Sequence, residues 1–251
     1  MGVTIPGTTV CGVPLAAAIG AFGGDPQKGL KTLEDITPRH VEMAQKLIAN
    51  NAVDIAVEET PDFIHLDLTL SAGENCCRVV VKGTHTNVVE LYINGQPQPL
   101  SEKQNTRTQR ETLPTFSLQQ AYDFINRVDF NDIRFILDAA RLNSALAAEG
   151  KTKKYGLNIN GTFSDAVKNG LMSNDLLSKV IINTVAASDA RMGGAPVVAM
   201  SNFGSGNQGI TATMPVVVVA EHLGVDEETL ARALSLSHLT AISIHSRYTR
   251  L

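Results

Sequence analysis

The hydrophobic periodicity of this chain changes near residue 100, and that change constrains the fold more than any other feature of the sequence. Before it, short runs such as Cys76–Lys82 and Val88–Ile93 are rich in β-branched residues and are separated by turn residues, which is typical of β-strands. After Pro114, apolar residues recur with the spacing of one helix face. Strands followed by a long run of helices predict the α+β class.

The first part predicts an antiparallel sheet with covering helices. Ala72-Gly73 and Asn94-Gly95 are turn signals among the strand candidates. Thr37-Pro38 opens a helix, because Thr can cap it and Pro is accepted at the first helical position. The predicted strands are Val53–Val57, Phe63–Leu70, Cys76–Lys82 and Val88–Ile93, and a helix is predicted over Val13–Phe22.

The second part predicts mainly helices. The polar run Ser101–Arg110 lacks apolar residues and is expected to be an exposed connection. The predicted domains are therefore 1–105, with mixed α and β structure, and 106–251, which is helical. Capping residues predict helices over Leu118–Val128 and Asp132–Ala148, one that starts at Ser173 or Asn174, one near Met214-Pro215, and one that starts at Asp226.

Composition and charge limit the class of partner. The 251 residues carry a formal charge of −4, and no long run of like charge stands out, which argues against nucleic acid or an anionic membrane. No apolar stretch has the length of a bilayer span, and the first residues lack a signal-peptide pattern. The three cysteines, Cys11, Cys76 and Cys77, make no disulfide framework, so a cytoplasmic location is expected.

Ligand binding is most expected in Ser188–Pro215, where glycine and small polar residues separate two predicted helices. Glycine lets backbone N–H groups approach a ligand closely. A helix start near Met214-Pro215 would aim unpaired N–H groups and a partial positive charge at the same place, which suits an amino-acid carboxylate. The alternative is a long surface loop with a helix cap. The candidate residues are Ser201, Asn202, Ser205, Gly206, Asn207 and Gln208.

Two further motifs allow more than one interpretation. Gly204–Gly209 matches the dinucleotide pattern Gly-x-Gly-x-x-Gly, but the expected second strand does not follow, so a nicotinamide-dependent oxidoreductase is a minor alternative. Gly83–Asn87 is either a polar hairpin turn or a loop that brings His85 and Asn87 to a site.

Charged and metal-binding side chains outside that segment are few. Arg191 could pair with a substrate carboxylate or with nearby Asp189. His238 and His245 lie seven apart on one helix face, whereas a metal pair prefers a spacing of three or four with a third ligand, so a hydrogen-bonded core or surface histidine is expected. Cys76 and Cys77 are adjacent in a strand and point to opposite faces, so no metal site is predicted.

Several segments resemble the bacterial and archaeal L-cysteine desulfidases, which are related to the alpha chain of iron–sulfur L-serine dehydratase. The resemblance covers the whole chain. It implies that residues 1 to about 105 correspond to the dehydratase beta domain and the remainder to the start of the alpha domain. The segments that carry it are Ala187–Ala195, Ser201–Val216, Val3–Thr8, Gly83–Val88, Ile133–Asp138 and Leu236–Leu239.

The resemblance implies a lyase that converts L-cysteine to pyruvate, ammonia and sulfide by β-elimination, or the corresponding L-serine dehydratase. Such enzymes hold an oxygen-sensitive 4Fe-4S cluster whose open iron acts as a Lewis acid on the leaving group. The expected partner is a small amino acid, L-cysteine or L-serine, and the sequence leaves open whether the chain forms a homo-oligomer. No residue is identified as the proton-abstracting base. A non-catalytic amino-acid sensor is the competing hypothesis.

The sequence departs from the family at the cluster. The family's cluster cysteines lie upstream, in a Gly-Cys-Thr-Glu-Pro motif, and downstream of the region seen here, and Cys11, Cys76 and Cys77 match none of them. We therefore expect an internal part of a longer protein that binds no cluster by itself and has no lyase activity. It is expected to retain substrate-binding residues, namely the six of the glycine-rich segment and, as second choices, His85, Asn87 and Arg191.

Overall fold

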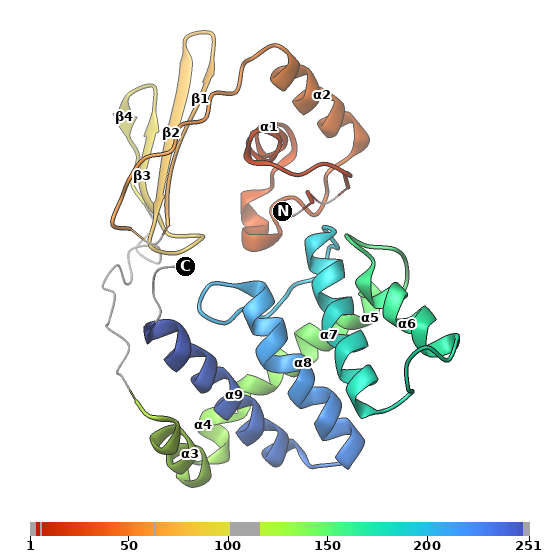
Figure 1. Ribbon diagram of the computed structural model, residues 1–251. Coiled ribbons are helices and arrows are strands. Elements are labelled where there is room, and N and C mark those ends of the chain that lie inside the picture. The colour runs from red at the N-terminus through yellow and green to blue at the C-terminus, as the bar shows by residue number, and fades with distance from the viewer. Residues whose placement is uncertain (1–3, 6, 63, 101–115, 248–251) are drawn as a thin grey trace. The chain divides into compact units, whose positions relative to one another are not determined.

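The computed structural model has the α+β fold that the change in periodicity predicted (Figure 1). It describes residues 4–5, 7–62, 64–100 and 116–247, so the predicted connection over Ser101–Arg110 lies outside the described residues. The chain divides into two compact units, Gly12–Leu113 and a helical unit of Met1–Cys11 with Pro114–Leu251. The sequence-based division at residue 105 had assigned none of the first eleven residues to the helical part.

The sheet of the first unit is an antiparallel meander in the order β1-β2-β3-β4, which confirms the predicted arrangement. Asn94 and Gly95 both have positive φ, 48° and 77°, as a two-residue Asn-Gly hairpin turn requires. The strands are β1 (His65–Ala72), β2 (Asn75–Lys82), β3 (Val88–Ile93) and β4 (Gln96–Pro97).

The predicted strand over Val53–Val57 is wrong. These residues belong to no strand of the structure, and the Val57 side chain is 97% exposed. β-propensity reflects packing against a partner strand, and this run of β-branched residues has none.

One face of the sheet carries a network of charges. Arg78 on β2 donates to Asp67 on β1, with Nη2 at 2.6 Å from the carboxylate, and to Glu90 on β3 at 3.3 Å. The guanidinium carbon also lies 5.7 Å from the centre of the Tyr92 ring. All the charged side chains of this network are about 40% exposed, so water screens their attraction.

Two helices complete this unit, α1 (Val13–Gly23) and α2 (Pro38–Ala49), and they pack against each other. Thr37 caps α2 as predicted and forms a capping box with His40. A short 3-10 turn, η1 (Pro26–Lys31), lies between them.

The helical unit is built around α8 (Gly206–Leu223), which contacts α5, α7 and α9 (Figure 1). Its core includes Ile210 and Met214 from α8, packed with Leu146 and Ala190. The other elements are α3 (Leu118–Arg127), α4 (Phe130–Ile133), η3 (Arg134–Ile136), α5 (Leu137–Gly150), α6 (Ile159–Lys168), α7 (Leu176–Met192) and α9 (Glu227–Arg247).

The helix predicted near Met214-Pro215 begins earlier, at Gly206, and Pro215 lies inside it. Ser205 caps this helix, because its Oγ accepts from the amide of Gln208 at 3.3 Å. Glycine and asparagine in the first turn are poor helix formers, but burial of the apolar face that follows outweighs their propensity. The irregular part of Ser188–Pro215 is therefore only residues 193–205.

Two other expectations about helices need correction. The single helix predicted over Asp132–Ala148 is divided into α4, η3 and α5, and Asp129 rather than Asn131 caps its start. Helix α6 was not predicted, since it follows Asn158 in a left-handed conformation (φ 53°) without a side-chain cap.

The N-terminal segment runs along the end of α7. The Thr4 amide donates to the carbonyl of Met192 at 3.0 Å, and Thr4 forms an isolated antiparallel bridge with Cys11. Gly194 has a φ of 74°, and a β-carbon there would collide with the Thr4 backbone. Glycine is therefore required where the chain leaves α7.

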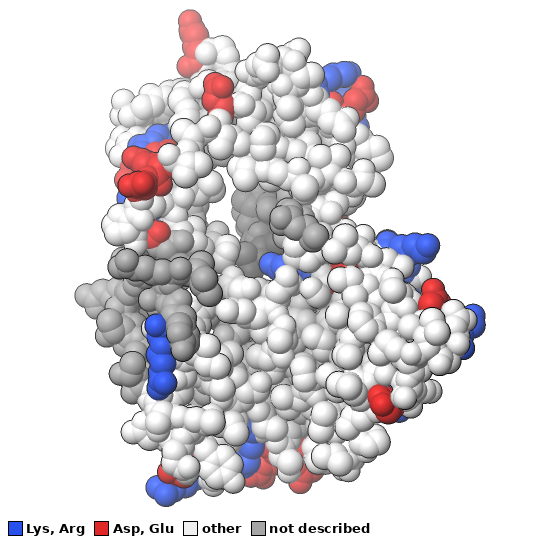
Figure 2. Space-filling view, viewed as in Figure 1, with Lys and Arg blue, Asp and Glu red and all other residues white. Residues whose placement is uncertain are grey.

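The surface charges and the lengths of the helices bear on the expected class of partner. Figure 2 shows basic and acidic side chains scattered over one face without a large patch of a single sign. Among the described residues, no helix combines the length and apolar character needed to cross a bilayer.

Candidate functional site

A tight turn precedes α8 and brings several predicted residues together. The amide of Asn202 donates to the carbonyl of Ser205, and the amide of Ser205 donates to the carbonyl of Asn202, both at 3.0 Å. The two central residues, Phe203 and Gly204, have φ values of 49° and 80°, as in a type I′ turn. A bulky residue seldom adopts this conformation, which costs about 1–2 kcal/mol. The Phe203 ring packs on the His245 ring of α9, with centroids 4.0 Å apart.

The first turn of α8 presents free amide groups. Ser205 satisfies the amide of Gln208, and Gly209 donates to the Ser205 carbonyl at 3.1 Å. Within the described ranges, the amides of Gly206 and Asn207 have no hydrogen-bond acceptor. With the partial positive charge of an 18-residue helix behind them, these two donors favour an anion.

Arg191, near the end of α7, lies against this helix start. A β-carbon on Gly206 would collide with Nε of Arg191, so the guanidinium stem passes directly over the first residue of α8. Its Nη1 donates to Oδ1 of Asn207 at 3.3 Å and lies 3.3 Å from the Met192 sulfur. Burial lowers the pKa of Arg191, although a guanidinium remains charged at any physiological pH.

No carboxylate among the described residues lies within ion-pair distance of Arg191. The predicted alternative partner, Asp189, is turned elsewhere: its Oδ2 accepts from the amide of Asn160 at 2.9 Å and from the side chain of Asn160 at 3.1 Å. A half-buried cation beside the positive end of a helix is unfavourable unless an anion joins it. The arrangement therefore suits a ligand carboxylate.

A buried network of polar side chains contacts the turn from the interior of the helical unit. Asn202 donates from Nδ2 to the carbonyl of His238 at 3.2 Å and lies 3.1 Å from the ring nitrogen Nδ1. The other ring nitrogen, Nε2, lies 3.0 Å from the hydroxyl of Thr213, which Asn143 Nδ2 approaches at 3.1 Å. All four residues are buried, and Oδ1 of Asn202 has no partner among the described residues.

The family of the chain follows from its sequence relatives. The family model described as serine dehydratase alpha chain matches residues 27–251. The chain belongs to the serine dehydratase alpha chain family. It is 99% identical to a UPF0597 protein of Klebsiella pneumoniae over 251 residues, and 46% identical to one of Chromobacterium violaceum over 252 residues. Each match covers 100% of this chain and 59% of the relative, so the chain spans about three fifths of the length of these proteins. No solved structure matches the chain.

The site residues that were predicted from the sequence of this member of the serine dehydratase alpha chain family fall into two groups. Six of them lie at the start of α8 or in the segment just before it, although the Ser201 and Gln208 side chains are exposed to solvent, and Arg191 reaches the same place from the end of α7. His85 and Asn87 lie in the other unit, between β2 and β3. Asn87 donates to the Lys82 carbonyl at 2.9 Å, which is the contact of a turn residue, and His85 is exposed.

The residues present do not fit the iron–sulfur cluster of serine dehydratases. Cys76 and Cys77 are neighbours on β2, in register with Ser71 and Leu70 of β1, and their side chains therefore point to opposite faces. Cys11 is exposed in the N-terminal segment. The described residues contain no group of three or more His, Cys, Asp or Glu side chains that could hold a metal ion.

Three polar residues of the network were not predicted as site residues. His238 was expected to be a hydrogen-bonded core or surface histidine, and the structure confirms the core position, where it is 7% exposed. Asn143 and Thr213 are fully buried. A signal existed for Asn143, because an amide on the apolar face of a predicted helix needs a partner.

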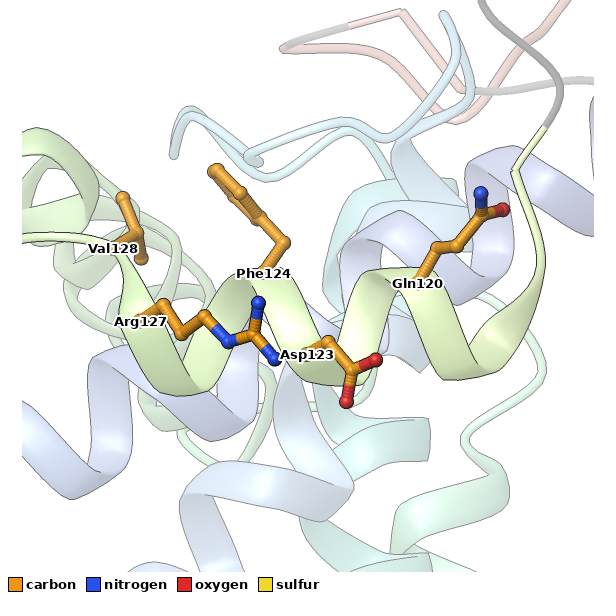
Figure 3. A pocket seen from close by; sticks show the side chains of 5 residues that line it. All are labelled: Gln120, Asp123, Phe124, Arg127 and Val128. Carbon is orange, nitrogen blue, oxygen red and sulfur yellow. The ribbon is translucent and has the colours of Figure 1, made fainter.

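A depression of about 480 Å³ lies elsewhere on the helical unit and does not qualify as the site. One helix, α3, and its C-terminal cap supply all its lining residues (Figure 3). None of them belongs to the glycine-rich segment, and no second element brings polar groups toward them. The lining residues are Gln120, Asp123, Phe124, Arg127 and Val128.

Proposed function

We propose that this chain is the amino-acid-binding part of an iron–sulfur lyase of the L-cysteine desulfidase type, which converts L-cysteine to pyruvate, ammonia and sulfide by β-elimination. L-serine dehydratase is the alternative within the same family. The observation that carries the proposal is the Arg191 guanidinium, which is half-buried over Gly206 without a carboxylate partner among the described residues. Membership of the serine dehydratase alpha chain family supplies the reaction class.

In this proposal the substrate carboxylate binds to Arg191 and to the free amides of Gly206 and Asn207. Charge-assisted hydrogen bonds of this kind are the strongest that a small zwitterion can make with a protein. The amino group binds to neutral oxygens of the preceding turn, in Ser201, Asn202 or Ser205. L-cysteine and L-serine share both groups, so these contacts serve either substrate equally.

In this proposal the iron–sulfur cluster is held by the longer protein and not by this chain alone. A 4Fe-4S cluster would supply the Lewis acid for the leaving group, but the cysteines of this chain do not assemble a site for it. The chain alone is therefore expected to bind amino acid without releasing sulfide or pyruvate. The binding partner is a small amino acid in the cytoplasm, with no contact to nucleic acid or membrane.

Two experiments test the proposal at different levels. Titration of the ¹⁵N-labelled chain with L-serine, followed by NMR, should shift the amide signals of Gly206 and Asn207, and the Arg191→Gln variant should abolish the shifts. The full-length Klebsiella pneumoniae relative, reconstituted anaerobically with iron and sulfide, should release sulfide and pyruvate from L-cysteine or pyruvate from L-serine. Binding without any product, with a cluster shown to be bound, would favour an amino-acid sensor instead.

A further inference from the structure

His238 lies at the centre of a buried chain of hydrogen bonds that connects three helices with the turn before α8. The chain runs from Asn143 on α5 through Thr213 on α8 and His238 on α9 to Asn202 in the turn. Each of these groups has a fixed number of donors and acceptors. The direction of every hydrogen bond in the chain can therefore be derived.

The hydroxyl of Thr213 determines the tautomer of His238. Its single hydrogen is donated to the carbonyl of Gly209, 2.7 Å away, since that oxygen can only accept. The Thr213 oxygen must then accept from Asn143 Nδ2 at 3.1 Å and from His238 Nε2 at 3.0 Å. His238 therefore carries a hydrogen on Nε2. Burial lowers the pKa of His238, which favours the neutral ring and leaves Nδ1 without a hydrogen.

The orientation of the Asn202 amide also follows from which neighbouring groups can donate and which can accept a hydrogen bond. The atom that lies 3.2 Å from the carbonyl of His238 must be a donor, so it is the amide nitrogen. Its second hydrogen is directed to the bare Nδ1 of His238 at 3.1 Å. Oδ1 of Asn202 is then the single end of the chain that lacks a partner among the described residues. Buried acceptors of this kind are rare in native proteins, and one beside a candidate site needs a donor.

We propose that His238 is a positioning residue for amino-acid binding, which holds the Asn202 amide so that Oδ1 is kept as the acceptor for the substrate ammonium group. The inference rests on the proposed function, because it takes an α-amino acid to be the ligand at the start of α8. An ammonium group donates three hydrogen bonds and accepts none, which complements an unpartnered oxygen. Oδ1 has almost no accessible surface, so the ammonium reaches it only when the strained turn at Phe203 shifts.

Protonation of His238 would break this arrangement. A hydrogen on Nδ1 would face the Asn202 amide nitrogen at 3.1 Å, and two donors would then oppose each other. The two side chains that contact the ring nitrogens, those of Thr213 and Asn202, are neutral, as is that of Asn143, which contacts Thr213. On α9 itself, His245 is a titratable group seven residues from His238, and hence on the same face of the helix. Arg191 keeps its charge throughout. Binding of amino acid should therefore weaken as His238 becomes protonated.

Two substitutions separate positioning from simple support of the fold. In His238→Asn, the side-chain amide places an acceptor near the position of Nδ1 and keeps the contact with Asn202, while the contact with Thr213 is lost. In His238→Gln, the amide reaches Thr213 and the contact with Asn202 is lost. L-serine binding, measured by NMR titration at pH 7.5, should stay within about threefold of wild type in His238→Asn and weaken about tenfold in His238→Gln. Both variants should lose the pH dependence of binding between about pH 7.5 and 5.5.

The outcomes distinguish this inference from the proposed function. If the wild-type chain binds no L-serine, the proposed function fails, whereas ¹⁵N NMR of the His238 ring still reports whether Nε2 carries the hydrogen. If wild type binds and the two variants are equally weakened, His238 only supports the fold and the inference is overturned. A hydrogen found on Nδ1 at neutral pH would overturn it as well. The control is His245→Phe, which keeps a ring against Phe203 and should leave the pH dependence unchanged.

Discussion

Each of the two units contains an arginine that contacts several side chains. In one unit carboxylates neutralise the guanidinium, and in the other they do not. Arg78 in the sheet unit is about 40% exposed and is bound by two carboxylates, those of Asp67 and Glu90. Arg191 in the helical unit is more buried, lies beside the positive end of α8, and contacts only an amide oxygen and a sulfur among the described residues. The exposed Arg78 has two carboxylate partners although water already stabilises its charge, whereas the more buried Arg191 has none among the described residues.

This contrast separates an arginine that is neutralised within the fold from one whose charge is left for a ligand. An exposed arginine gains little from its partners, because water screens the attraction. A half-buried arginine without a carboxylate partner lowers the stability of the fold, so its presence calls for another explanation, and the proposed binding of an amino acid supplies one. The comparison predicts that stability and ligand affinity respond differently at the two positions.

The largest effect is expected for Arg191→Gln. Removal of the guanidinium takes away the charge-assisted contact with the carboxylate, so the affinity for L-serine should fall at least about thirtyfold. The free energy of unfolding should change little, since no carboxylate is left unpaired and only the long contacts with Asn207 Oδ1 and the Met192 sulfur, both at 3.3 Å, are lost. NMR titration and urea denaturation measure the two quantities. A large loss of stability with unchanged affinity would show that Arg191 supports the fold instead.

A smaller effect is expected for Gly206→Ala. The new β-carbon collides with Nε of Arg191 and displaces the guanidinium without removing it, so affinity should fall about tenfold. Gly20→Ala on α1 is the matched control, because a β-carbon there meets no atom within 4 Å. That variant should gain about 0.5–1 kcal/mol of stability and keep its affinity. Equal affinities in the two variants would contradict the placement of Arg191 over Gly206.

The pH dependence of stability tests the neutral state of His238. Its pKa in the folded protein is below the ordinary value of about 6.5, so the unfolded chain binds the proton more readily. The neutral His238 ring therefore makes its full contribution to the free energy of unfolding above about pH 6.5. This contribution is lost as the pH falls from there to the pKa of the folded state. Urea denaturation at pH 7.5, 6.5 and 5.5 should show a decline in wild type that is reduced in His238→Gln. Parallel curves would mean that other groups cause the decline.

The smallest effect is expected for Arg78→Gln. The pairs with Asp67 and Glu90 are exposed, so the melting temperature should change little and the difference should shrink further in high salt. The affinity for L-serine should equal that of wild type. A loss of affinity comparable to that of Arg191→Gln would remove the distinction between the two arginines.

Part of the candidate site could be proposed from sequence because its residues are neighbours along the chain. Ser201 to Gln208 follow one another, and their small polar side chains indicate a ligand loop before any fold is known. The exact place of the helix start could not be predicted, since Pro215 suggested the first helical position and Ser205 supplied the actual cap. The importance of Arg191 could not be ranked either, because the collision that places it over Gly206 depends on how α7 meets α8.

For the fold as well, features that depend on neighbouring residues could be predicted, and features that depend on long-range packing could not. The Asn94-Gly95 hairpin and the capped starts of α2 and α3 were predicted, because each depends on a few neighbouring residues. Val53–Val57 was wrong, because strand formation needs a partner that no local pattern supplies. The network of Asn143, Thr213 and His238 joins residues up to 95 positions apart, from 143 to 238, and only the packing of α5, α8 and α9 brings them together.

The fully assigned hydroxyl of Thr213 also has a consequence for proton movement. Its hydrogen is held by the carbonyl of Gly209, which cannot pass a proton onward, and the lone pair of His238 Nδ1 is occupied by the Asn202 amide. The four side chains therefore orient the Asn202 amide but do not form a path along which a proton can move. In the proposed lyase reaction, the base that removes the substrate proton needs a lone pair that is open to the ligand. With the hydrogen-bond directions inferred above, His238 does not offer one.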